Sequence, residues 1–346
     1  LRAVPPCCDE KFLVYGRERA NSGRYFLKRA KVETSVSENH TAQPLVSVCI
    51  PIYNGAEFLD EMLDSLERIE YPNIEIIISD DSSTDASLQI VKKRALKNCR
   101  ILEHENLGLV ENWNYCLRHV NGKYVKFLFQ DDLLQPSCIG KLVAIAEKDC
   151  QVGMVFSARK LLSSVDLDPQ LFPEDLYLSW KGLHEIQTGQ SMIDSRQFRC
   201  NPYNKIGEPT NVLIRTSIFG IIGNFDASFR QLPDLEMWCR IMTQYSVGFI
   251  EEKLASFRIH DNQTSSVNAR GNRTWIEIFK LWHKMSYHHT FDALPAPTRR
   301  VIKFFFYKRV VKFIIINAVK RNWTRCKDLS KLLFVALRSQ MTRLQL

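Results

Sequence analysis

Two consecutive acids, Asp131 and Asp132, directly follow an apolar run that ends at Phe129 and predicts a strand. Neighbouring carboxylates repel each other unless a cation lies close to them. Mg²⁺ typically binds through one or two carboxylates together with substrate phosphates. An isolated Asp-Asp pair is more often a turn that caps the next helix. Its position at a strand end favours a cation site that would hold a diphosphate.

The segments around these acids alternate between strands and helices. Strands are predicted at 46–52, 74–79, 100–102, 124–129 and 152–156, and helices at 58–69, 109–120 and from 136. A helix at 233–245, a strand at 247–257 and basic, mostly helical sequence from 274 follow. This alternation predicts an α/β fold whose mostly parallel central sheet is flanked by helices. Ligands bind beyond the carboxyl ends of such strands, where the acidic turns fall.

The sequence lacks the glycine-rich motifs of two common nucleotide-binding classes. No G-x-G-x-x-G follows the first predicted strand, which disfavours a dinucleotide-dependent dehydrogenase. No G-x-x-x-x-G-K-[ST] occurs, which disfavours a P-loop kinase or ATPase. A nucleotide bound without such a loop needs another means of neutralising its phosphates, and a divalent cation on carboxylates provides one.

Four blocks, taken as an ordered set, resemble one enzyme family. They read VSVCIPIYN at 46–54, SDDSSTD at 79–85, NLG at 106–108 and QDD at 130–132. With later segments to about residue 265, this order resembles the family 2 glycosyltransferases. The resemblance implies an inverting enzyme with the GT-A fold, which has a Rossmann-like nucleotide-sugar half at 45–158 and an acceptor half at 159–265. It also implies transfer of a sugar from a nucleotide-diphosphate sugar, UDP above dTDP or GDP, to a hydroxyl of a glycan or lipid-linked acceptor in surface polysaccharide synthesis.

The resemblance also implies roles for the residues of the donor site. Tyr53 matches the aromatic residue that stacks on the donor base, and Asp81 matches the acid that accepts the ring N–H of the base. The remaining positions expected to contact the donor are Pro51, Asn54, Asn106, Gly108, Gln130, Asp131 and Arg258.

A metal site for Mn²⁺ or Mg²⁺ is implied at the end of the same block. Asp132 matches the last acid of the family's Asp-x-Asp element and is expected to be the principal ligand, with Asp131 beside it. His260, in an Arg-x-His segment, is expected to complete the metal shell or to contact the diphosphate, with a structural histidine as the alternative. The sequence departs from the family pattern at Gln130, where the first acid of the element is expected. A glutamine there can hydrogen-bond a ribose or phosphate but brings no charge.

The catalytic base is expected in the second half of the chain. In-line displacement at an anomeric carbon needs a base on the face opposite the leaving diphosphate. Asp234 falls where the family places its catalytic carboxylate, Pro233 replaces the acid usual before it, and Glu236 is the rival candidate. An ordinary Asp, with a pKa of about 3.9, is a weak base unless a drier site raises that value. The segment Gly207-Glu208-Pro209-Thr210 resembles the loop that faces sugar and acceptor, and a plain turn is the alternative.

The cysteines and the apolar runs bear on the compartment. The ten cysteines include no C-x-x-C pair, and Cys49 lies inside a predicted buried strand. This placement fits reduced thiols in a cytosolic protein better than a disulfide framework. No secretory signal is visible, and no run approaches the roughly 20 apolar residues of a spanning helix. We therefore expect a cytoplasmic protein, with peripheral attachment to the inner face of the plasma membrane as a further hypothesis.

The positive charge is concentrated near the end of the sequence. The chain has a net charge of +9, and residues 299–346 contain thirteen Lys or Arg and a single acid, Asp328. One side of a helix predicted there carries Lys308, Arg309, Lys312 and Lys320, and the other carries Phe304, Ile315 and Val319. Such a helix suits an anionic membrane surface, with packing on the catalytic domain as the alternative. A nucleic-acid partner is not expected, because no interleaved aromatic platform or reading motif accompanies the charge.

Three regions are therefore predicted: an N-terminal extension at 1–44, a GT-A domain at 45–265 and a basic helical C-terminal region at 266–346. The alternative to an enzyme is a GT-A-fold module that binds nucleotide or glycan without turnover. Gln130 and Pro233, the two departures from the family pattern, support that alternative.

Overall fold

The computed structural model describes residues 17–19, 25–27, 43–163, 173–260, 263, 273–321, 326–327, 329–331 and 333–334. The chain divides into two compact units, Leu1–Gln43 and Pro44–Leu346. In the first unit, β1 (Arg17–Arg19) pairs with β2 (Tyr25–Leu27) in an antiparallel ribbon. Apart from these strands, only Gln43 and Pro44 of the predicted N-terminal extension lie among the described residues.

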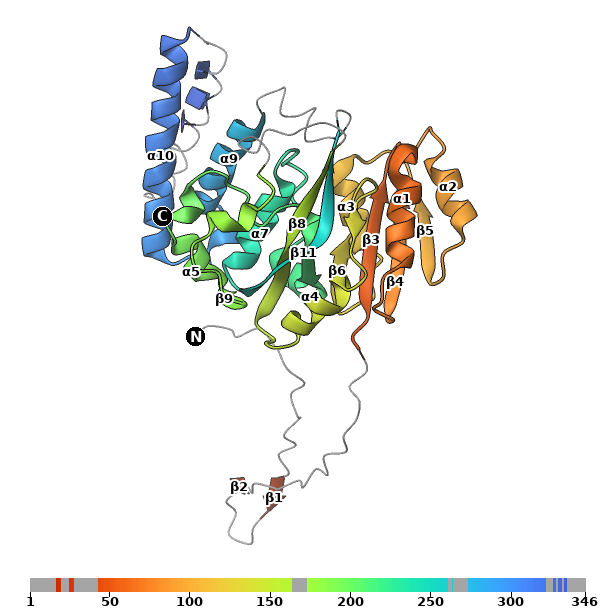
Figure 1. The fold of residues 1–346 in the computed structure, drawn as a ribbon. Helices are drawn as coiled ribbons and strands as arrows, with labels where there is room; N and C mark the ends of the chain where they lie inside the picture. The colour runs from red at the N-terminus through yellow and green to blue at the C-terminus, as the bar shows by residue number, and fades with distance from the viewer. Residues whose placement is uncertain are drawn as a thin grey trace. The chain divides into compact units, whose positions relative to one another are not determined.

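The described strands of the second unit build one nine-stranded sheet (Figure 1). Its path runs β5-β4-β3-β6-β10-β8-β11-β7, and β9 pairs with β11. The strands are β3 (Val46–Ile52), β4 (Ile74–Asp80), β5 (Cys99–Glu103), β6 (Tyr124–Phe127), β7 (Leu133–Leu134), β8 (Val152–Ser163), β9 (Ile186–Thr188), β10 (Val212–Arg215) and β11 (Ser246–Ile259).

The sheet is parallel in its first half and mixed in its second. Strands β5, β4, β3 and β6 run parallel to one another. Strand β10 is antiparallel to both β6 and β8. Strands β8 and β11 are parallel, while β7 and β9 are antiparallel to β11. The expected mostly parallel sheet is therefore correct only for the nucleotide half, because β10 enters between β6 and β8 in the reverse direction.

Helices cover both faces of this sheet. They are α1 (Ala56–Glu67), α2 (Ser87–Arg94), α3 (Leu109–Leu117), α4 (Cys138–Ala146), α5 (Gly189–Asp194), α6 (Phe219–Ile222), α7 (Pro233–Met242), α9 (Arg273–Tyr287) and α10 (Ala296–Val319). Short 3₁₀ turns lie at Leu176–Ser179, Gln197–Arg199, Pro209–Asn211, Thr216–Ile218 and His289–Phe291. Figure 1 shows α9 and α10 at the end of the unit opposite to α2 and β5.

Two hydrophobic clusters, one on each face, explain the continuous apolar strands. Within β3, Val48 and Ile50 join a cluster with α1 and α4, whereas Cys49 joins the other cluster with α3, α7, α9 and α10. Because a strand's side chains alternate between faces, a strand buried on both sides must be apolar at every position. This double burial fixes the strand ends, and therefore the loops that carry the polar residues.

Helix α10 packs on the unit with a face other than the one expected. Ile302, Phe306 and Val310 are buried, whereas Phe304, Ile315 and Val319 are exposed. The exposed apolar side chains therefore share a face with the lysines, and do not lie opposite them. Among the residues described, no helix combines the length and apolar character needed to cross a membrane.

Candidate active site

The end of β3 and the loop after β4 are joined by hydrogen bonds. The backbone N–H of Asp81 donates to the carbonyl of Ile52 at 3.0 Å. Asn54 donates its backbone N–H to Ser83 Oγ at 3.0 Å, and its Oδ1 accepts from the N–H of Thr84 at 2.8 Å. Asn54 therefore holds the two loops together, and its positive φ of 47° turns the chain out of the sheet.

Two further predicted donor residues differ in their exposure. The side chain of Tyr53 is 47% exposed, so its ring has a face open for stacking. Pro51 lies buried within β3. Its ring is therefore not exposed to a ligand, and Pro51 can affect donor binding only through the position of the β3 backbone.

Asp81 organises the turn that begins α3. Its Oδ1 accepts from the N–H of Leu107 at 2.6 Å, and its Oδ2 accepts from the N–H of Gly108 at 2.9 Å. Asn106 Nδ2 donates to the Asp81 carbonyl at 3.0 Å. Gly108 has a φ of +86°, a conformation that disfavours residues with a Cβ. The buried Asp81 carboxylate is thus fixed in orientation, and each oxygen retains a lone pair for one more donor.

Gln130 forms a reciprocal pair with the backbone of Tyr53. Its Oε1 accepts from the Tyr53 N–H at 2.8 Å, and its Nε2 donates to the Tyr53 carbonyl at 3.1 Å. Gly55 leaves room for this pair, because a Cβ at that position would lie 2.4 Å from Gln130 Cδ. An ionised Asp or Glu offers no N–H donor, so it cannot make both bonds. The departure from the family pattern therefore has a structural reason that the sequence did not reveal.

Asp132 lies in the turn between β6 and β7 and is 0% exposed. Its Oδ2 accepts from the hydroxyl of Thr210 at 2.5 Å, and its Oδ1 accepts from the Arg258 N–H at 3.0 Å. Burial and the nearby charge of Asp131 raise the pKa of Asp132 well above its ordinary value. A carboxylate in this setting is stabilised by any cation that binds close to it.

Asp131 and His260 lie side by side. Nε2 of His260 lies 3.0 Å from Oδ2 of Asp131, and the His260 ring packs on Phe58 with centroids 4.6 Å apart. Arg258 donates from Nε to the Asp131 carbonyl at 2.9 Å and forms an ion pair with Glu61 at 2.5 Å. Phe58 and Glu61, on α1, were not predicted, because only the fold brings that helix to β11.

The residue types at this position fit a divalent cation. Asp131 and His260 supply an oxygen and a nitrogen ligand next to each other, and Mg²⁺ sites commonly use few protein ligands with substrate phosphates. Within the described ranges, no three His, Cys, Asp or Glu side chains gather as a complete metal site. Asp132, the expected principal ligand, accepts one hydrogen bond on each oxygen, from Thr210 and from Arg258, and each oxygen keeps a lone pair. Since no three-residue group that includes Asp132 gathers among the described residues, a cation here would rely on Asp131, His260 and the diphosphate.

Asp234, in the first turn of α7, has the features of a general base. Its Oδ2 accepts from Asn204 Nδ2 at 2.7 Å, while its Oδ1 is buried without a partner. Burial is the main cause that raises the pKa of Asp234 to about 7, and the negative charge of Glu208 adds to it. The N–H of Leu235 and the Asn204 amide act in the opposite direction. A carboxylate with a pKa near neutrality can accept a proton efficiently at physiological pH.

The rival candidate, Glu236, has a structural role. It is fully buried, and its Oε2 accepts from Arg240 Nε and Nη2 at 2.9 and 2.7 Å. Its Oε1 accepts from Lys284 Nζ at 2.6 Å. With both oxygens paired to cations, Glu236 is a poor proton acceptor, because losing either ion pair would leave a buried charge.

A single loop connects Asp132 with Asp234. Thr210 contacts Asp132, and Asn204, six residues earlier, contacts Asp234. Trp238 Nε1 donates to the Gly207 carbonyl at 3.0 Å, and Arg159 forms an ion pair with Glu208. Residues 204–210 therefore link Asp132 and Asp234 through side-chain hydrogen bonds. Asn204 and Arg159 were missed because their partners are far away in sequence.

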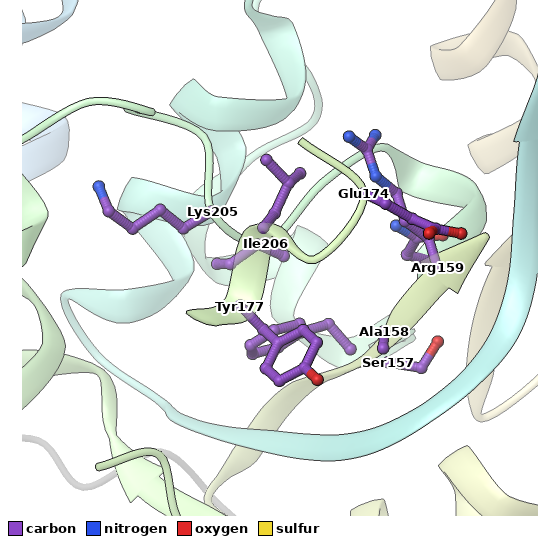
Figure 2. A pocket seen from close by; sticks show the side chains of 10 residues that line it. Ser157, Ala158, Arg159, Glu174, Tyr177, Lys205 and Ile206 are labelled. Carbon is purple, nitrogen blue, oxygen red and sulfur yellow. The ribbon is translucent and has the colours of Figure 1, made fainter. Parts of the chain in front are cut away.

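A small cavity borders this loop. It has a volume of only about 10 Å³, room for about one water molecule, and is lined by Phe156, Ser157, Ala158, Arg159, Glu174, Leu176, Tyr177, Lys205, Ile206 and Asn211. Figure 2 shows the β8 side chains Ser157 and Arg159 together with Tyr177 and Lys205 from the following segments. Its volume is below the 300–1,000 Å³ or so that is typical of ligand pockets. It is therefore too small to be the nucleotide site.

Comparisons with known proteins agree on one class. The family profile described as Glycosyl transferase family 2 matches residues 47–195. An uncharacterized glycosyltransferase of Rickettsia typhi is 30% identical over 238 residues, which cover 66% of this chain and 68% of the relative.

Two solved structures share the fold. TarS of S. aureus, in complex with UDP-GlcNAc, has a TM-score of 0.64 at 17% identity and covers 85% of this chain and 81% of its own. A mannosyltransferase from Pyrobaculum calidifontis, in complex with GDP-Man and Mn²⁺, has a TM-score of 0.53 at 17% identity, with 87% and 88% covered. The expected GT-A fold with C-terminal helices is thereby confirmed.

Proposed function

Because this chain belongs to glycosyltransferase family 2, we propose that it is an inverting enzyme whose catalytic base is Asp234. The observation that carries this proposal is the Asp234 carboxylate, which has one buried oxygen without a partner and a pKa raised to about 7. Asp234 takes the proton of the acceptor hydroxyl. The hydroxyl oxygen forms the new bond to the anomeric carbon while the bond from that carbon to the diphosphate breaks on the opposite face.

The donor is a nucleotide-diphosphate sugar, with UDP as the favoured nucleotide. The exposed ring of Tyr53 and the fixed carboxylate of Asp81 suit a base that stacks and donates a ring N–H. UDP-GlcNAc in TarS and GDP-Man in the Pyrobaculum enzyme support a donor of this class. The Gln130 amide keeps the Tyr53 backbone in place beneath the base.

A divalent cation, Mn²⁺ or Mg²⁺, is proposed at Asp131 and His260. When bound, it neutralises the charge that develops on the leaving diphosphate. Arg258 orients Asp131 through its carbonyl, and Asp132 holds the Arg258 backbone and the Thr210 loop. The Mn²⁺ in the Pyrobaculum enzyme supports this proposal.

The acceptor is proposed to be a glycan or lipid-linked hydroxyl in surface polysaccharide synthesis, used at the cytoplasmic face of the plasma membrane. The support is the exposed face of α10, which we call the α10 stripe: Val301, Phe304, Lys308, Val311, Lys312, Ile315 and Val319, all exposed. The stripe spans about 27 Å at the α-helical rise. Helix α10 contains no acid, so its charge suits anionic lipid headgroups. Cys49, Cys116, Cys138 and Cys239 are buried free thiols, which fits a reducing compartment.

A binding module without turnover is the second candidate. Gln130 brings no charge, and each oxygen of Asp132 already accepts a hydrogen bond. Thermal-shift measurements with UDP, GDP, dTDP and CMP, with and without Mn²⁺, combined with nucleotide release from the matching sugar nucleotides, separate the two. Binding with Mn²⁺-dependent release supports the enzyme, whereas tight binding without release supports the module. A ligand at one hundred times its Kd adds about 2.7 kcal/mol of stability to the folded state, which such an assay detects.

A further inference from the structure

Glu277, in the first half of α9, binds three consecutive backbone N–H groups. Its Oε1 accepts from Arg230 at 2.8 Å, and its Oε2 accepts from Gln231 and Leu232, both at 2.9 Å. The Glu277 side chain belongs to a residue only 8% exposed. A buried carboxylate needs such partners, and charge-assisted bonds of this kind are stronger than neutral ones. Glu277 therefore fixes the backbone of residues 230–232.

The segment held in this way leads directly into the proposed base. Leu232 is the N-cap of α7, Pro233 is its first residue, and Asp234 follows. The Leu232 carbonyl accepts from the N–H of Glu236 at 3.1 Å, which starts the helical hydrogen bonding. Because Asp234 lies two residues beyond the last amide held by Glu277, any rotation of that loop moves the Asp234 carboxylate.

Two lysines on the same face of α9 hold the adjoining segment. Lys280 Nζ donates to the carbonyl and the hydroxyl of Ser228 at 2.5 and 2.8 Å. Lys284 Nζ lies 2.6 Å from both Asp226 Oδ2 and Glu236 Oε1. Residues 277, 280 and 284 follow the spacing of one helix face. Helix α9 therefore contacts residues 226–236 along its length. Both the helix and this segment lie outside the residues matched by the family profile, 47–195.

From these contacts we propose that Glu277 is a positioning residue for Asp234, and that α9 holds the backbone segment that carries this base. The proposal rests on the proposed role of Asp234 as the base. Glu277 does not contact Asp234 itself. The groups that face the Asp234 carboxylate are Asn204, the N–H of Leu235 and the charge of Glu208. Glu277 acts through the backbone that presents Asp234 to them.

Loss of the Glu277 carboxylate has a distinct chemical consequence. In Glu277→Gln, one acceptor oxygen remains for three N–H groups, and the amide N–H₂ faces donors. The 230–232 loop then relaxes and water gains access to Asp234. Since burial is the main cause of the raised pKa of Asp234, hydration lowers that pKa toward the ordinary value of about 3.9. The base becomes both weaker and misplaced.

The test measures nucleotide release by full-length wild type, Glu277→Gln and Glu277→Asp across pH, with octyl glycosides as acceptor probes and the donor that wild type turns over fastest. We expect kcat of Glu277→Gln to fall about 10- to 100-fold, the scale of loss caused by misplacing a catalytic group by about 1 Å. The KM for donor stays near the wild-type value, and the acid limb of the kcat profile moves to lower pH. Glu277→Asp, which keeps the charge, restores part of both effects and serves in place of Glu277→Gln if that variant does not fold.

Lys280→Met is the matched control, because it removes contacts from the same helix to the same segment without touching residues 230–232. It is expected to lower Tm while leaving the acid limb in place. If Glu277→Gln lowers only Tm, with kcat and the acid limb as in wild type, the positioning role is overturned. If wild type releases no nucleotide from any donor, the role of Asp234 as base fails, and the positioning proposal fails with it.

Discussion

Asn204 donates a hydrogen bond to Oδ2 of Asp234 at 2.7 Å, and the second oxygen of that carboxylate remains buried without a partner. This arrangement holds the carboxylate in one orientation and leaves the lone pairs of its second oxygen unused. It also keeps a carboxylate in a site that disfavours its charge. The ionised Asp234 carboxylate therefore lowers the stability of the folded protein, and this loss can be measured as a change in Tm.

Asp234→Asn is expected to stabilise the protein at pH 8. Because the folded-state pKa of Asp234 is raised to about 7, the folded protein holds a proton that the unfolded chain has lost between about pH 4 and 7. The contribution of this group to stability is therefore complete below about pH 4 and is lost as the pH rises through 7. The amide is neutral throughout and its carbonyl still accepts from Asn204. We predict the largest rise in Tm at pH 8, where a pKa raised from about 4 to about 7 corresponds to at most about 4 kcal/mol, a smaller rise at pH 5, and none near about pH 3.5.

The comparison of Tm across pH is the internal control for this prediction. A substitution that merely repacks the site would change Tm equally at pH 5 and pH 8. If Asp234→Asn lowers Tm at pH 8, the carboxylate is not held in an unfavourable environment, and its assignment as a base with a raised pKa is wrong.

Gln130→Glu is expected to weaken donor binding, although it restores the acid of the family pattern. The glutamate can accept from the Tyr53 N–H but cannot donate to the Tyr53 carbonyl, and it adds a negative charge near Asp131. The KM for the donor should rise about tenfold, the effect of about 1.4 kcal/mol, and Tm should fall. Glu57→Gln, a change of the same size at an exposed position of α1, is the control. Tighter donor binding by Gln130→Glu would instead assign residue 130 to the metal site.

Asp131→Asn and His260→Ala are expected to weaken metal dependence specifically. After treatment with a chelator, both variants should need at least tenfold more Mn²⁺ than wild type for half-maximal nucleotide release, because each removes one of two adjacent ligands. Saturating Mn²⁺ should restore part of the rate. Glu61→Gln, which alters only the ion pair to Arg258, separates loss of a ligand from loss of local structure. An unchanged Mn²⁺ requirement in both variants would place the cation elsewhere.

Phe304→Asp combined with Ile315→Asp is expected to abolish binding to anionic vesicles. Both side chains are exposed on the α10 stripe, at 68% and 58%, so the changes should leave the fold intact while adding charges that phosphatidylglycerol repels. Co-sedimentation with phosphatidylglycerol-containing vesicles measures the effect, with neutral phosphatidylcholine vesicles as reference. Leu178→Asp, an exposed apolar position away from α10, is the control variant. Equal binding of wild type and the double variant to anionic vesicles would remove the membrane role of α10.

The nucleotide half of the fold was predictable because its signals are local. The predicted strand 46–52 matches β3 (Val46–Ile52), since a strand buried on both faces is a continuous apolar run. Strands β8 and β11 extend to Ser163 and Ile259, beyond the predicted 156 and 257, because they are paired with each other across a long stretch. The two-residue strand β7 exists only through its pairing with β11. No sequence window contains that information.

In the candidate site, too, residues in local motifs were predictable and residues defined by distant partners were not. Asp81, Asp132 and Asp234 stand in motifs, so their types and spacing pointed to them. Thr210 stands in a predicted loop, but its contact with Asp132, 78 residues away, did not follow from that prediction. Glu277 stands in no motif and matters only through its partners, 45 to 47 residues away in the chain. The role of Gln130 was equally hidden, because its partner is the backbone of Tyr53 and not a side chain.

The most direct measurement is the rate of nucleotide release by wild type and Asp234→Asn at saturating Mn²⁺, with donor affinity determined separately for each. Removal of a general base reduces rates by about 10²- to 10⁴-fold. We predict a loss in that range for kcat with donor affinity unchanged, because Asp234 acts on the acceptor hydroxyl and not on the nucleotide. Release by Asp234→Asn at the wild-type rate would contradict the assignment of Asp234 as the base.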